Sequence, residues 1–95
     1  FIASGGGTVA PVINGGSITT AATTSQGLIR MDGAGVTPTV ANLTLSGGDH
    51  SLYFINGAGG SFTNNVLDGA LNGAVYLSGN ANPAINGSNT VSNTP

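Results

Sequence analysis

The segment Ser51-Leu52-Tyr53-Phe54-Ile55-Asn56-Gly57 is a short β-prone run between turn residues, and it recurs twice. The other copies are Gly27-Leu28-Ile29-Arg30-Met31-Asp32-Gly33 and Gly73-Ala74-Val75-Tyr76-Leu77-Ser78-Gly79. The three copies align without gaps, and their closing glycines are 24 and 22 residues apart. Short apolar runs bounded by Gly, Asn and Asp are typical of β-strands. A strand that returns at a nearly constant period indicates a repeat fold.

A second apolar series interleaves with the first and shares its period. Its copies are Ile13-x-x-Gly16-x-Ile18, Val40-x-x-Leu43-x-Leu45, Phe62-x-x-Asn65-x-Leu67 and, more loosely, Ile85 to Val91. We therefore predict an all-β fold, a parallel β-helix (β-solenoid) with two strands in each coil of about 22 residues and about three to four coils. A β-sandwich is the alternative, because strand spacings of about 8–12 residues also occur in this sequence. Residues 1–95 form a single solenoid segment in this interpretation, as part of a longer solenoid or fibre.

Alternation along each strand assigns side chains to the two faces of the coil wall. Asn65 is expected inside at a turn, where its amide can bond backbone groups in place of water. Tyr53 is also expected inside, where its hydroxyl group would need a partner. The full inner set is Ile18, Ile29, Met31, Val40, Leu43, Leu45, Tyr53, Ile55, Phe62, Leu67, Val75 and Leu77.

The opposite face of the strand series that opens this section is largely apolar. A contiguous exposed apolar patch indicates contact with another surface. Insertions in solenoids often mark a binding face, and three extra residues occur around Thr20-Ala21-Ala22-Thr23-Thr24-Ser25. The candidate interaction surface is Leu28, Arg30, Leu52, Phe54 and Tyr76.

The composition excludes several classes of function. Charged residues make up 4% of the chain, and one Arg with no Lys gives almost nothing to bind nucleic acid. Cysteine is absent, and no apolar run approaches the length of a membrane span. His50 beside Asp49 is expected to be a solvated turn residue, and Asp32 and Asp68, each followed by Gly, are turn signals. We expect no enzyme activity, no catalytic or metal-binding residues and no cofactor.

Phe62-Thr63-Asn64-Asn65-Val66-Leu67-Asp68-Gly69, followed by the copy at residues 73–79, resembles one repeat of pectate-lyase-like parallel β-helix proteins. The resemblance covers nearly the whole chain and implies a right-handed β-helix. The texture is most similar to passenger regions of bacterial autotransporter adhesins, and secondly to phage tailspikes or tail fibres. The catalytic acids and basic residues of pectate lyases and polygalacturonases have no matching positions in this sequence.

These observations favour a structural or adhesive segment of an extracellular, cell-surface or virion-surface protein. It would present a binding surface without chemistry of its own, for a host glycan or a surface receptor. The chain begins and stops within a coil, so self-association, end to end or as a homo-oligomer, is also expected. The alternative is a tailspike fragment that binds or, when intact, degrades polysaccharide. An ice-binding solenoid is a third possibility, but only Thr37-x-Thr39 fits the Thr-x-Thr ranks that it requires.

Overall fold

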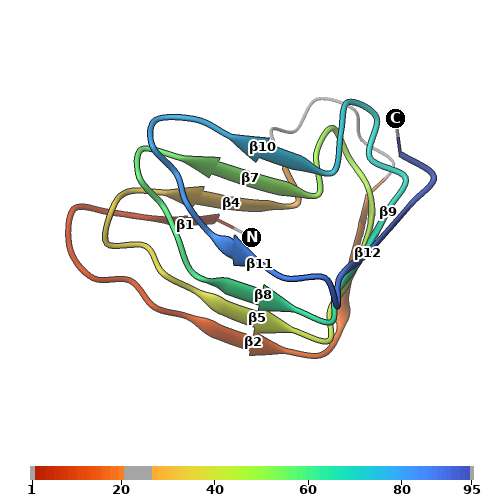
Figure 1. Cartoon of the computed structure of the whole chain (residues 1–95), viewed down its shortest axis with the longest axis horizontal. Coiled ribbons are helices and arrows are strands. Elements are labelled where there is room, and N and C mark those ends of the chain that lie inside the picture. Colours follow the sequence, from red (N-terminus) through yellow and green to blue (C-terminus); the bar gives the residue numbers. More distant parts are fainter. Residues whose placement is uncertain (1, 21–26, 95) are drawn as a thin grey trace.

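The computed structural model describes residues 2–20 and 27–94, and every element in these residues is a β-strand. The strands form three parallel four-stranded sheets that together enclose the core (Figure 1). Sheet I contains β1 (Ile2–Ser4), β4 (Ile29–Asp32), β7 (Leu52–Ile55) and β10 (Val75–Leu77). Sheet II contains β2 (Val12–Asn14), β5 (Thr39–Ala41), β8 (Ser61–Thr63) and β11 (Ala84–Ile85). Sheet III contains β3 (Ser17–Thr20), β6 (Thr44–Gly47), β9 (Val66–Asp68) and β12 (Thr90–Ser92).

The predicted parallel β-solenoid is confirmed, with about three turns of roughly 23 residues. The prediction of two strands in each coil is wrong, because each coil has three. The second apolar series spans two strands, which meet at a two-residue corner such as Asn42-Leu43 between β5 and β6. Asn42 turns the chain there with a φ of 58°, a left-handed conformation that Asn adopts more readily than most residues.

The first coil is longer than the others. Ile18 pairs with Leu45 and Ile29 pairs with Leu52, so 11 residues in the first coil match 7 in the second. The extra length therefore lies between β3 and β4, where the sequence predicts an insertion. Residues 21–26, which hold most of that predicted insertion, lie outside the described residues.

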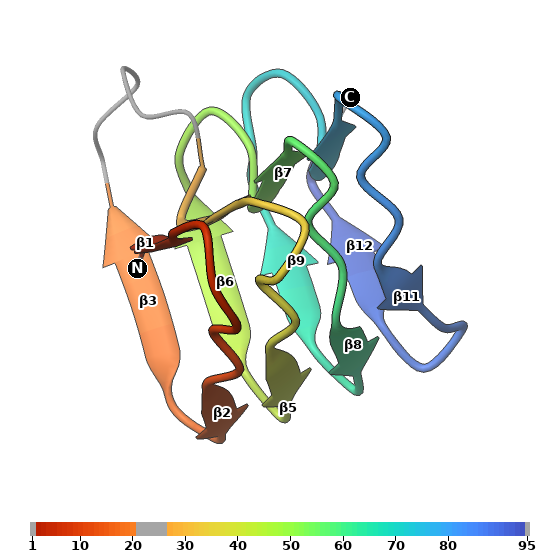
Figure 2. The ribbon, with the colours of Figure 1, turned by 90° about the vertical axis from the view of Figure 1, so that its left-hand side faces the viewer.

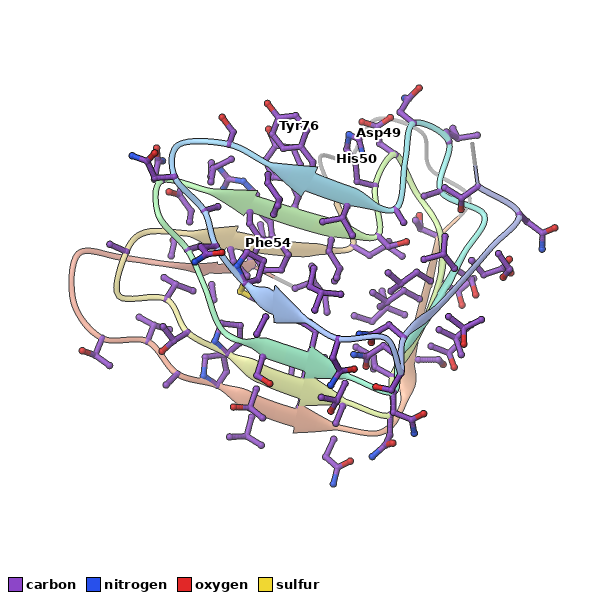
Figure 3. All side chains as sticks on the ribbon, in the orientation of Figure 1. Asp49, His50, Phe54 and Tyr76 are labelled. Carbon is purple, nitrogen blue, oxygen red and sulfur yellow. The ribbon has the colours of Figure 1, made fainter. Side chains whose placement is uncertain are left out.

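Columns of apolar side chains, one from each coil, fill the interior. The inward positions predicted for Val40, Leu43, Leu45, Phe62 and Leu67 are confirmed, since each is at most 3% exposed. Phe54 also lies inside (Figure 3), and its ring meets that of Phe62 edge to face at 5.0 Å between centroids. This contact joins sheet I to sheet II across the core.

The predicted faces of β7 are wrong by one residue. Leu52 and Phe54 are 2% and 0% exposed and point inward, while Tyr53 and Ile55 lie on the outer face. The sequence alignment matched Gly33 with Gly57, but Asp32 pairs with Ile55, which places Asn56 at the level of Gly33. Asn56 has a φ of 55° and occupies the left-handed position that Gly fills in other coils.

The expected exposure of Leu28 is also wrong, since this side chain is 6% exposed and belongs to the core. Leu28 precedes β4 in a turn, so strand alternation does not apply to it. Val75 and Leu77 lie in the inner columns as predicted, because they pair with Leu52 and Phe54. They are nevertheless 36% and 51% exposed, since among the described residues no strand lies beyond β10.

Asparagine ladders hold the corner between sheets II and III. On the surface, Asn42 donates to Asn14 and Asn64 donates to Asn42, at 2.8 and 2.6 Å. Inside, the Asn65 side chain accepts from the Leu43 N–H and donates to the Val40 carbonyl. The inward position predicted for Asn65 is thus confirmed, and its amide satisfies backbone groups that water does not reach.

Candidate interaction surface

Two stacked tyrosines stand on the outer face of sheet I. Tyr53 of β7 pairs with Tyr76 of β10, and strand pairing brings their rings together 4.5 Å apart with planes 8° from parallel. Arg30 of β4 occupies the same outer column, one coil earlier. Tyr76 points away from the core, in contrast to Phe54 (Figure 3). Tyr76 is 38% exposed, so the stack is accessible at its last member.

His50 closes one side of the stack from the turn between β6 and β7. Its ring centroid lies 5.4 Å from that of Tyr76 and 6.0 Å from that of Tyr53. His50 Nδ1 lies 2.8 Å from the Gly73 carbonyl oxygen, which only accepts, so Nδ1 carries the hydrogen of this bond. The side chain is 13% exposed, so the expected solvated turn histidine is instead a packed residue that links two coils.

The three carboxylates of the chain share one arrangement. Each accepts a hydrogen bond from an asparagine one coil later: Asp32 from Asn56, Asp49 from Asn72 and Asp68 from Asn93. Asp32 also accepts from Arg30 at 3.4 Å, and Asp49 lies 3.6 Å from His50 Nε2. These contacts tie successive coils together, so the carboxylates act as part of the stack.

We name Arg30, His50, Tyr53 and Tyr76 the tyrosine patch. Of the surface predicted from sequence, Arg30 and Tyr76 lie on it, whereas Leu28, Leu52 and Phe54 are buried and cannot contact a partner. Tyr53 and His50 were missed. The signal for Tyr53 was present, because Tyr53 and Tyr76 are separated by 23 residues, one period of the solenoid. No comparable sequence signal marks His50, since its position depends on how the turn folds.

The outer face of sheet III is an array of hydroxyl side chains. Its four strands lie side by side (Figure 2), and Leu45 and Leu67 point inward between outward neighbours. Three ranks carry two hydroxyl groups each, and the β9 rank carries Val66 and Asp68 instead. The hydroxyl ranks are Ser17 with Thr19, Thr44 with Ser46, and Thr90 with Ser92.

Asp68 is held by neighbours on this face. Asn93 Nδ2 and Ser92 Oγ donate to its carboxylate at 2.8 and 2.9 Å. These bonds, with that from Asn93 the larger cause, favour the ionised form and lower the pKa of Asp68 below its ordinary value.

The described residues form no pocket and no group of three or more His, Cys, Asp or Glu side chains that could hold a metal ion. The same residues include no helix long and apolar enough to cross a bilayer. The structure therefore offers lateral faces, in particular the tyrosine patch and the hydroxyl face, as its candidate sites.

A scan against models of known protein families and searches of curated proteins and of solved structures found no match to this chain.

Proposed function

We propose that this chain is a structural and adhesive β-solenoid segment of an extracellular, cell-surface or virion-surface protein. It presents a lateral binding surface and has no chemistry of its own. The observation that carries this proposal is the tyrosine patch, an exposed and preorganised aromatic stack on a rigid sheet. The uncharged composition of the chain supports an exterior location, and the resemblance of its repeats to autotransporter passengers supports an adhesin as the parent protein.

The tyrosine patch has the composition of a binding hot spot. Tyr and Arg are enriched among the residues that dominate binding energy at interfaces. Tyr53 and Tyr76 are already stacked on each other and on His50, so little side-chain freedom remains to be lost when a partner binds. Preorganisation of this kind increases affinity without adding contacts.

The partner that fits this surface is an uncharged host glycan. Aromatic rings offer an apolar contact, while the exposed Asn72 and the carboxylate of Asp49 lie at the border of the patch and can hydrogen-bond to hydroxyl groups. Arg30 is paired with Asp32, so the patch has little net charge with which to select an anion.

Glycan-array binding tests the proposal directly. We expect Tyr76→Ala to weaken binding of the wild-type ligand at least tenfold. Val12→Ala is the matched control, because Val12 is 76% exposed on β2 of sheet II, and its truncation should leave binding unchanged. Equal binding by wild type and Tyr76→Ala, or binding to protein receptors without any glycan, would contradict the assignment of the ligand.

An ice-binding solenoid is the second candidate, and the hydroxyl face of sheet III favours it. Three of the four strands carry paired hydroxyls at the spacing of successive strands, about 4.8 Å. Val66 and Asp68 interrupt the array in the third rank. A measurement of thermal hysteresis decides this candidate: activity that Thr44→Lys abolishes supports it, and no activity in the wild type excludes it.

A further inference from the structure

The two ends of the solenoid present matching open strand edges. Within the described residues, β10, β11 and β12 pair only with β7, β8 and β9, so each has one unpaired edge at the C-terminal face. At the N-terminal face, β1, β2 and β3 pair only with β4, β5 and β6. Each face therefore offers three parallel strand edges, arranged in the same order around the coil (Figure 2). Unpaired edges are templates for pairing with another strand.

The inner columns are also open at the C-terminal face. The column of sheet III contains Leu45 and Leu67, which are 0% and 1% exposed, but its last member, Val91, is 55% exposed. In sheet I, Leu77 follows Phe54 in the column and is 51% exposed. These side chains occupy core positions without the next coil that would cover them.

We infer that the C-terminal face binds the N-terminal face of a second copy of this chain, so that copies stack head to tail into a continuous solenoid. The inference rests on the proposed structural role and names the partner as the chain itself. The three pairings would repeat an interface that the chain already forms three times between its own coils. The occupant of the open edges is thus argued from the geometry of the established coil-to-coil contact.

Strand positions predict the register of this stack. Ala3 pairs with Met31, which pairs with Phe54, which pairs with Leu77, so the equivalent position on the second copy places Leu77 over its Ala3. By the same equivalence Ile85 meets Ile13 and Val91 meets Ile18. Apolar side chains thereby continue each inner column.

The outer column continues as well. Ile2, which is 66% exposed, takes the position beside Tyr76 that Tyr53 holds within the chain. An exposed apolar side chain on each face thus gains a neighbour, while the edges of the Tyr76 ring stay on the lateral surface.

A two-fold contact between identical ends fits less well. Rotation about an axis perpendicular to the solenoid reverses the order of the three sheets, so two of them would face unlike sheets with antiparallel strands. A head-to-tail contact keeps every sheet in line and every strand parallel. Contacts of this heterologous kind do not close, and they generate filaments rather than dimers.

Size-exclusion chromatography with light scattering on the full chain tests the inference. The C-face variant is Leu77→Lys with Val91→Lys, and the N-face variant is Ile13→Lys, with Ile2→Lys as a second N-face variant should Ile13→Lys fail to fold. Circular dichroism confirms that each is folded. We expect the wild type to associate increasingly with concentration, and each variant alone to associate at least tenfold more weakly, because Lys blocks an edge.

A mixture of the two variants separates the possible geometries. Head-to-tail stacking predicts a one-to-one heterodimer, because each variant keeps one intact face of opposite kind. Thr44→Lys, which places the same charge on the lateral face of sheet III, should associate like the wild type.

A monomeric wild type, a mixture that stays monomeric, or an N-face variant that dimerises on its own would overturn the inference. Loss of association in Thr44→Lys would also overturn it, in favour of lateral packing. None of these outcomes changes glycan binding by the tyrosine patch, which Tyr76→Ala tests separately.

Discussion

The second and the last coils of this solenoid have the same architecture but opposite exposure. Leu52 and Phe54 of β7 are 2% and 0% exposed, whereas Val75 and Leu77, which follow them in the same columns, are 36% and 51% exposed. The side chains are of similar size and point in the same direction. What differs is that β7 has a strand on both sides and β10 has one on a single side. Burial in this fold is therefore a property of the stack, and a coil is stabilised by its neighbours.

The largest effect should come from truncating the same residue type in the two coils. Leu52→Ala removes side-chain atoms from the packed interior and should lower the free energy of unfolding by about 2–5 kcal/mol. Leu77→Ala, on the exposed end of the neighbouring column, should lower it by less than about 1 kcal/mol. Urea denaturation measures both. Equal losses would mean that the last coil is covered in solution, as head-to-tail stacking predicts at high protein concentration, so the comparison requires dilute samples.

An intermediate effect is expected at the buried amide ladder. Asn65→Leu removes the partners of the Leu43 N–H and the Val40 carbonyl, and leaving such groups unpaired costs about 1–3 kcal/mol each. The matched substitution Asn89→Leu, one coil later, should cost less, because Asn89 is only half-buried and water can replace its bonds. Thermal unfolding of the two variants ranks them. A larger loss for Asn89→Leu would show that the last coil is not the weaker one.

The smallest effect concerns pH and the carboxylate of Asp68, which joins the third coil to the last. Its pKa is lowered in the folded state by hydrogen bonds from Asn93 and Ser92, so it contributes stability above its unfolded pKa and loses that contribution as pH falls through the folded value. The difference in stability between wild type and Asp68→Asn should therefore be present near neutral pH and should shrink below about pH 4. A difference that stays constant across this range would show that the hydrogen bonds do not distinguish the two protonation states.

The sequence predicts the solenoid because the period and the inner apolar positions are encoded locally. Val40, Leu45, Phe62 and Leu67 recur at fixed positions beside turn residues, and nothing but strand alternation is needed to place them inside. The number of strands in each coil was not predicted. The corner at Asn42 interrupts the backbone geometry without interrupting the apolar pattern, so one pattern was interpreted as one strand.

The faces of β7 were mispredicted for a different physical reason. The alignment treated Gly57 as the equivalent of Gly33, whereas Asn56 takes that place in the structure. Asn and Gly both tolerate a positive φ, and this conformational equivalence is invisible to an alignment by residue type. A shift of one residue exchanges the two faces of a strand, which moved Phe54 out of the predicted core and Tyr53 into it.

The parallel pairing between coils also has a mechanical consequence. The inter-coil hydrogen bonds run along the solenoid axis, from Leu52 N–H to the Ala74 carbonyl for example, and the covalent chain winds across that axis. Tension along the axis therefore loads these bonds in line and peels coils away one after another, beginning where a coil has a single neighbour. Tension across the axis is carried by the covalent backbone of each coil. Single-molecule pulling along the two directions should give low, repeated rupture forces in the first case and higher resistance in the second.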